Sequence, residues 1–205
     1  NYQSIEDESE AVNKYLDKCE ELGAISDLME LPETCGTLPL SCVVRDKDRR
    51  KSRLTKKPLK VRVVADFSRQ VNDALEKWKF QYEGVDAAAE LITRNCWLAT
   101  VDISKFFLRV PLHKAAYGTS LFRDPRAKGK KQYGHFKSLM FGSKLAPAFC
   151  SAISAEALTI LRHEIAPRSS AFVDDFILAA EEEWNCERRS EEHTSELQSR
   201  QYLVC

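Results

Sequence analysis

Three aspartates stand out because each interrupts sequence of apolar, β-strand character. Asp102 ends the run 97–101, and the pair Asp174 and Asp175 lies between two short apolar runs. An ionised carboxylate in such a context is costly unless a cation compensates it. Carboxylate oxygens suit Mg²⁺, and paired metal ions can stabilise the attacking and leaving oxygens of a phosphoryl transfer. The three acids therefore indicate the chemistry of polymerases and some nucleases, although an Asp-Asp pair alone also fits an exposed hairpin turn.

The flanking sequence predicts how these acids are held. Residues 97–101 are rich in β-formers, which places Asp102 at the end of a strand. Residues 171–178 form two apolar runs around the acidic pair and predict a hairpin with the carboxylates at or near its turn. A helix is predicted from about 146 to 163, and Pro147 suits its first turn.

Further elements are predicted from periodicity and from breaker residues. An amphipathic helix is expected over residues 5–22, with Gly23 as its stop. Two strands separated by a hydrophilic, basic stretch read as a long hairpin. These strands cover residues 41–44 and 61–65, and a helix over 86–94 and a strand region over 133–141 complete the set.

Composition indicates a globular chain. Its 205 residues are 43% hydrophobic, enough for one domain or for two closely packed subdomains. The chain has no apolar run near the roughly 20 residues that span a bilayer, and its acidic start lacks the features of a secretory signal. We therefore expect an intracellular protein without a membrane partner. The seven cysteines are scattered singly, as reduced thiols are and zinc ligands are not.

Charge is distributed unevenly although the net charge is zero. Residues 1–33 hold ten acidic residues against two lysines, and residues 45–62 hold ten basic residues against two aspartates. A second basic cluster follows within residues 123–137. Two basic stretches could bracket a phosphate backbone, while either stretch alone equally fits a solvated charged loop.

Four segments, taken in order, resemble the motifs of reverse transcriptases. They are residues 60–72, 101–112, 141–149 and 172–175, the last being Phe-Val-Asp-Asp. The resemblance covers about residues 5–180. It implies an α+β fold with the fingers and palm of a right-hand polymerase, an antiparallel palm sheet packed on helices, and no thumb. The implied parts are a lead-in at 1–40, fingers at 41–96, and a palm at 97–185 with an interleaved fingers segment at about 113–145.

The resemblance also implies the roles of the acids. Asp102, Asp174 and Asp175 would be the catalytic carboxylates and metal ligands, and the backbone carbonyl of Ile103 a further ligand. Two Mg²⁺ ions are implied as cofactors, with Mn²⁺ able to replace them.

Nucleotide-binding residues follow from the same resemblance: Arg62 for the triphosphate, Phe107 below the sugar, and Phe141 with Gly142 lining the pocket. A ring at 107 would clash with a ribose 2′-hydroxyl and so select dNTPs. Taken alone, Arg62 could be an exposed basic residue and Phe107 an ordinary core aromatic.

Nucleic-acid contacts are implied in the basic fingers stretch, where Arg45, Lys47 and Lys60 compete for the role of the triphosphate-binding lysine. The implied partners are an RNA or DNA template, a DNA or RNA primer and dNTPs. The implied location is cytoplasmic or nuclear, including a retroelement particle.

Two departures from the family pattern are Met140 in place of a proline and Phe172 in place of the commoner tyrosine. Motif style is closest to retrotransposons with long terminal repeats or tyrosine recombinases. No thumb or RNase H segment follows Glu183, so the chain is expected to be an incomplete polymerase that needs these parts of a longer polyprotein.

Two alternatives remain open at this stage. A non-catalytic or domesticated nucleic-acid-binding remnant would keep the fold for its groove, although the retained acids argue against it. A two-metal nuclease would not need Arg62, Phe107 and Gly142 together.

The last residues form a separate case. From Arg189 onward the sequence resembles a translated sequencing adapter, so residues 186–205 are expected to be a non-native tail. The alternative is a genuine acidic helix.

Overall fold

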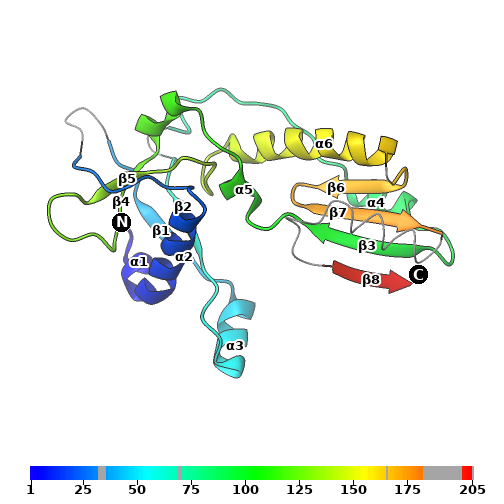
Figure 1. Cartoon of the computed structure of the whole chain (residues 1–205), viewed down its shortest axis with the longest axis horizontal. Helices are drawn as coiled ribbons and strands as arrows, with labels where there is room; N and C mark the ends of the chain where they lie inside the picture. Colours follow the sequence, from blue (N-terminus) through cyan, green and yellow to red (C-terminus); the bar gives the residue numbers. More distant parts are fainter. Residues whose placement is uncertain (32–35, 69–70, 165, 182–199, 205) are drawn as a thin grey trace. The chain divides into compact units, whose positions relative to one another are not determined.

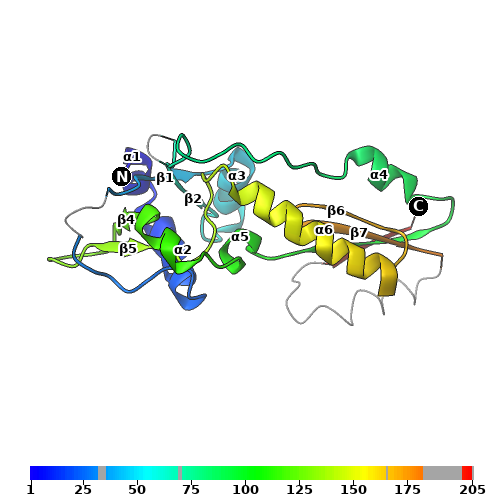
Figure 2. The same ribbon diagram turned by 90° about the horizontal axis from the view of Figure 1, so that it is seen from above.

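The computed structural model describes residues 1–31, 36–68, 71–164, 166–181 and 200–204 (Figures 1 and 2). The chain forms two compact units. Unit 1 comprises Asn1–Glu76 and Phe107–Ala146, and unit 2 comprises Lys77–Phe106 and Pro147–Cys205. The chain therefore passes twice into each unit. The predicted fingers begin at residue 41 and the predicted palm at residue 97, whereas the chain first leaves unit 1 after Glu76. The assignment of residue ranges to fingers and palm stays a prediction.

Unit 1 is built from short helices around two small antiparallel sheets. Its helices are α1 (Gln3–Asp7), α2 (Ser9–Glu21), α3 (Asp46–Thr55), α5 (Phe106–Arg109, which starts at the unit boundary) and the 3₁₀ helix η1 (Lys114–Thr119). Its strands are β1 (Leu40–Val43), β2 (Arg62–Ala65), β4 (Leu121–Arg123) and β5 (Tyr133–His135). Strand β1 pairs with β2, and β4 pairs with β5.

The core of unit 1 joins α2 to both sheets. Val12 and Leu16, one helical turn apart, are fully buried on α2, and Gly23 follows the helix at φ +67°. Phe122 and Phe136 stack in the core, with ring centroids 4.3 Å apart. Val63 and Ala65 of β2 belong to the same core. The core therefore positions β2, which begins with the predicted nucleotide-binding residue Arg62.

Unit 2 is a four-stranded antiparallel sheet with helix α6. Its elements are α4 (Val85–Glu90), β3 (Trp97–Asp102), α6 (Ala146–Glu164), β6 (Ser169–Phe172), β7 (Asp175–Ala180) and β8 (Arg200–Val204). The strand order is β6-β7-β3-β8. Leu158 of α6 packs in one core with Val101 of β3 and Phe176 of β7. Apolar residues at alternate positions of β3 and β7 thus pack with the helix, and the acids Asp102 and Asp175 stand at the strand ends.

Most predicted elements are present, with three differences. The helix predicted over 5–22 is broken at Glu8 into α1 and α2. The predicted strand region 133–141 holds only the three-residue β5. The stretch read as a basic loop contains α3, which has no buried residue and hence offered no apolar periodicity to detect. No helix among the described residues is long and apolar enough to span a membrane.

The proposed non-native tail, residues 186–205, lies largely outside the described residues, at 186–199 and 205. Its remaining part forms β8, which pairs antiparallel with β3 along Trp97–Val101. The non-native character of this tail stays a prediction.

Candidate active site

Two of the three aspartates lie directly opposite each other in the sheet of unit 2. Asp102 is the last residue of β3, Asp175 is the first of β7, and the two are Cα partners in the antiparallel register. The backbone N–H of Ile103 donates to the carbonyl of Asp174 at 2.9 Å. Strand β3 and the hairpin therefore bring the backbone positions of the three predicted catalytic aspartates together at one end of the sheet.

The turn that carries Asp174 is strained. Phe172 pairs with Asp175, so Val173 and Asp174 form a two-residue loop. Val173 has φ +57°, a conformation that a β-branched residue adopts only when its surroundings impose it. The buried Ser154 hydroxyl of α6 donates to the Val173 carbonyl and provides one such restraint. Ser154 was not singled out from sequence, since an isolated serine in a helix carries no signal.

The negative charges of the aspartates at this site raise the pKa values of neighbouring groups. Partial burial and, after it, the charge of Asp102 raise the pKa of the Asp175 carboxyl. Burial and then the charge of Asp174 raise the pKa of the Cys150 thiol on α6 to about 11. Asp175 is thus affected by the charge of Asp102 on β3, whereas the charge of Asp174 affects Cys150 on α6.

The three carboxylates do not all converge on one point. Within the described part of the chain no group of three or more His, Cys, Asp or Glu side chains is close enough to hold a metal ion. Asp174 lies in the turn, whereas Asp102 and Asp175 stand on paired strands, so the three acids are held by different local structures. Asp102 and Asp175 nevertheless form an all-oxygen donor pair of the kind that Mg²⁺ prefers. A divalent cation would also relieve the repulsion that raises the pKa of Asp175, so the residues fit the ion.

A second cluster, in unit 1, gathers the predicted nucleotide-binding residues around Phe141. The Phe107 and Phe141 rings lie with their centroids 4.8 Å apart. The guanidinium of Arg62, the first residue of β2, lies 5.8 Å from the Phe141 ring centroid in a cation–π contact. Three residues far apart in sequence therefore form one contact group.

Position 142 must be glycine because neighbouring atoms of unit 1 leave no room for a side chain. It has φ +111°, and a Cβ atom built on it would overlap the carbonyl oxygen of Ala65 in β2. Asn72 holds the same loop from the other side, because its amide donates to the Gly142 carbonyl and its side-chain oxygen accepts from the Lys144 N–H, each at 2.9 Å. Asn72 closes the first of the four sequence motifs, but its role as a clamp was not predicted.

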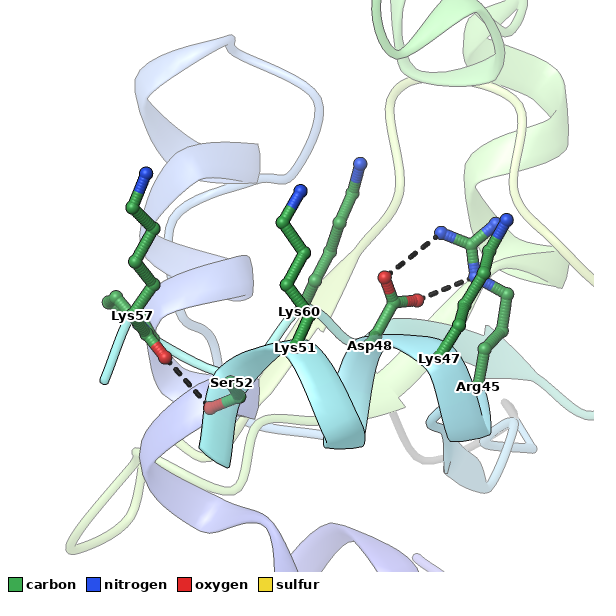
Figure 3. Close-up of a pocket in the computed structure, with 8 residues that line it drawn as sticks. Arg45, Lys47, Asp48, Lys51, Ser52, Lys57 and Lys60 are labelled. Carbon is green, nitrogen blue, oxygen red and sulfur yellow. Dashed lines mark hydrogen bonds and ion pairs between the residues drawn. The ribbon is translucent and has the colours of Figure 1, made fainter. Parts of the chain in front are cut away.

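The basic stretch of unit 1 forms a cavity around α3. The cavity has a volume of about 410 Å³, and its lining includes the three predicted nucleic-acid-binding residues, Arg45, Lys47 and Lys60. Arg45 is engaged in an ion pair with Asp48 at 2.6 Å. In Figure 3 the ammonium groups of Lys47, Lys51, Lys57 and Lys60 extend to the same side of α3. No ion pair neutralises these four lysines within the described ranges.

Comparison with known proteins gives a consistent result. Residues 47–203 match the model of the family described as "Reverse transcriptase (RNA-dependent DNA polymerase)". Among solved structures, the prototype foamy virus protease-reverse transcriptase (CSH mutant) is similar with a TM-score of 0.67 and 16% identity over 99% of this chain. The foamy viral protease-reverse transcriptase in complex with an RNA/DNA hybrid has a TM-score of 0.67 and 16% identity over 100% of this chain.

These likenesses confirm the predicted α+β fold with an antiparallel sheet packed on helices. The chain spans about a quarter of the foamy virus proteins, 24% in each of the two cases. A search of curated protein sequences found no match.

Proposed function

The chain belongs to the reverse transcriptase (RNA-dependent DNA polymerase) family, and on that premise we propose that it carries the catalytic part of an RNA-directed DNA polymerase. The reaction would be attack of a primer 3′-hydroxyl on the α-phosphate of a dNTP. The observation that supports this most is the register of unit 2, which sets Asp102 opposite Asp175 beside the turn that holds Asp174.

The acids act in this proposal by binding cations. Family membership implies a dependence on divalent metal. Asp102, Asp174 and Asp175, with the Ile103 carbonyl, would hold two Mg²⁺ ions or, in their place, Mn²⁺. When bound, such ions lower the charge of the phosphates and stabilise the attacking and leaving oxygens. The carboxylates need not accept a proton. The Ile103 N–H bond to the Asp174 carbonyl fixes the spacing of the two β-segments on which the acids stand.

Unit 1 supplies nucleotide recognition in this proposal. Arg62 has a delocalised charge that can grip phosphate oxygens, and its contact with Phe141 orients the guanidinium. Phe107, packed on Phe141, would exclude a 2′-hydroxyl and so favour dNTPs. Gly142 and Asn72 hold the loop that carries Phe141.

Template and primer would be bound partly through the lysine-lined cavity around α3. Four lysines without ion pairs to described residues are suited to backbone phosphates, and their contribution would weaken with added salt. The foamy viral protease-reverse transcriptases were solved with an RNA/DNA hybrid and with double-stranded DNA, which supports duplex substrates for this chain too. We propose an intracellular site of action.

Primer extension on an RNA template tests this function. We expect extension that depends on Mg²⁺ and falls by at least about 10³-fold in Asp174→Asn, because a metal ligand is lost while the side-chain shape is kept. Asp86→Asn, on the exposed α4 of the same unit, is the matched control and should extend as wild type does. Equal extension by Asp174→Asn and wild type would exclude the assigned role.

The second candidate is a nucleic-acid-binding remnant without catalysis. It is favoured by the finding that the three carboxylates are not gathered into one metal-binding group among the described residues. Tight binding of primer–template by the wild-type chain, with no extension under any metal, would select this alternative.

A further inference from the structure

A row of aromatic residues lies in unit 2 immediately before α4. Trp78, Phe80 and Tyr82 occupy every second position, and Lys77 and Lys79 alternate with them. The rings of Phe80 and Tyr82 pack edge to face with centroids 5.1 Å apart, so the alternation places neighbouring rings together. This segment lies beside α6 in both views of the fold (Figures 1 and 2).

Two contacts extend this row to other elements. Trp78 meets Phe149 of α6 edge to face at 5.2 Å, and Tyr82 meets Phe172 at the end of β6 at 4.8 Å. The five rings are called the aromatic strip below. Because Phe172 directly precedes the turn of Val173 and Asp174, the strip reaches the hairpin that carries the catalytic acids.

The aromatic strip is largely open to solvent. Trp78 and Phe172 are each 55% exposed, and Phe80 and Phe149 are 41% and 39% exposed. Single exposed apolar residues are common, but exposed rings in contact with one another, here one pair and one group of three, mark a surface that binds something. These edge-to-face and tilted contacts hold the rings in place while leaving ring surface free to stack on a further planar group.

The charge around the aromatic strip indicates what that partner is. Lys77 and Lys79 are exposed and have no ion pair with residues that the structure describes. Lysine is depleted at the centre of protein–protein interfaces, whereas basic groups interleaved with aromatic rings are typical of surfaces that bind single-stranded nucleic acid. The composition therefore favours nucleic acid over a protein partner.

We propose that the aromatic strip is a stacking surface for unpaired nucleobases, with Lys77 and Lys79 contacting the phosphates of the same strand. The partner class rests on the proposed function, because a polymerase must lead a single strand toward its acid-bearing hairpin. The stacking itself is independent of catalysis. It concerns residues distinct from the acids, from the nucleotide cluster of unit 1 and from the lysine cavity around α3.

Binding of a short oligothymidylate to the full chain tests the proposal. Trp78→Leu keeps an apolar contact to Phe149 but removes the large ring, and it should weaken binding by about tenfold. Trp78→Phe should retain most of the affinity, because phenylalanine can also stack. The matched control is Ile160→Ala, which changes another exposed apolar residue of α6 outside the five rings, 51% exposed, and its affinity should be unchanged.

Tryptophan fluorescence separates stacking from general attraction. A base stacked on Trp78 quenches its emission, so oligothymidylate should quench wild type but quench Trp78→Phe far less. An abasic oligonucleotide of the same length has the phosphates without the bases, and it should cause no such quenching. Lys77→Gln with Lys79→Gln should reduce the salt slope of binding by about 1.4, whereas Trp78→Leu should leave the slope unchanged.

The possible outcomes are distinct. Equal affinity of wild type and Trp78→Leu, or equal quenching by the abasic strand, would overturn the proposal. A change in self-association by Trp78→Leu without any change in oligonucleotide affinity would assign the surface to a second copy of the chain and overturn it as well. Quenching and its loss as expected, in a chain that fails to extend primers, would support the stacking surface while rejecting the polymerase function.

Discussion

Unit 1 and unit 2 each gather charged side chains, and the two groups have opposite sign. Unit 1 gathers the ammonium groups of four lysines around α3, and unit 2 gathers Asp102, Asp174 and Asp175 at one end of its sheet. We propose that the lysines bind phosphates of template and primer and that the acids bind divalent cations. The two groups stand on different local structures, a helix in unit 1 and a strand end with its hairpin in unit 2.

The units differ also in how their backbones are held. In unit 1 the loop at Gly142 is fixed by Asn72 and by close approach to Ala65, so its unusual backbone is well supported. In unit 2 the unusual backbone at Val173 belongs to a residue type that disfavours it, and it lies two residues before Asp175, which the charge of Asp102 repels. Strain and repulsion are thus found at the proposed catalytic hairpin, where function is the best reason for keeping them.

The largest effect on stability is expected at Gly142. Gly142→Ala forces a methyl group into the Ala65 carbonyl at a positive φ, and we expect the free energy of unfolding to fall by about 3 kcal/mol. Gly129→Ala is the matched control, since Gly129 also has positive φ, +86°, but has open space around it. Its cost should be only about 1 kcal/mol, from the backbone conformation alone. Urea unfolding followed by circular dichroism measures both, and equal losses would show that the contact with Ala65 is unimportant.

Val173→Gly should have an effect of opposite sign in unit 2. Glycine adopts φ +57° without steric cost, so we expect unfolding to become harder by about 1 kcal/mol while primer extension decreases. Ala171→Gly, in regular β6 of the same hairpin, should instead destabilise by about 1 kcal/mol. Thermal unfolding of wild type, Val173→Gly and Ala171→Gly measures the two changes in stability. A destabilised Val173→Gly would mean that the turn holds no strain.

A smaller effect concerns pH and His135 in unit 1. Burial, and then the charge of Lys137, lower the pKa of His135, whose Nε2 has no hydrogen-bond partner among the described residues. Between the lowered value and the ordinary value of about 6.5, the unfolded chain binds a proton that the folded chain does not. The free energy of unfolding should therefore fall as pH drops below about 6.5.

His135→Gln should remove part of this pH dependence, and His163→Gln, at the exposed end of α6, should keep it. Denaturant titrations above and below about pH 6.5 provide the comparison. Identical pH dependence in His135→Gln and wild type would assign the acid sensitivity to other groups.

Sequence was sufficient for the parts of the site that depend on local pattern. The β-rich run before Asp102 and the two apolar runs around Asp174 and Asp175 predicted a strand end and a hairpin, because alternation and turn position are local properties. Long-range contacts were not accessible in this way. The proximity of Gly142 to Ala65 joins residues far apart in the chain, whereas Gly142 was predicted only to line the nucleotide pocket.

Helix α3 illustrates a different limit. Its ten residues include no buried side chain, so the apolar periodicity that identifies helices is missing, and the basic residues and Pro58 read as a loop. The three carboxylates were expected to form one metal-binding group, which is not found among the described residues, for a third reason. Adjacent acids suggest a common target, but Asp174 lies in the turn and Asp175 in strand β7.

Binding of Mn²⁺ to the full chain, measured by titration calorimetry, tests the central claim that the acids of unit 2 form a cation site. Wild type should bind the ion, and Asp102→Asn and Asp175→Asn should each weaken binding by at least about tenfold, because each removes a charged oxygen ligand. Asp86→Asn should bind as wild type does. Equal Mn²⁺ affinity in all four proteins would contradict the claim that Asp102 and Asp175 face each other in order to hold a metal.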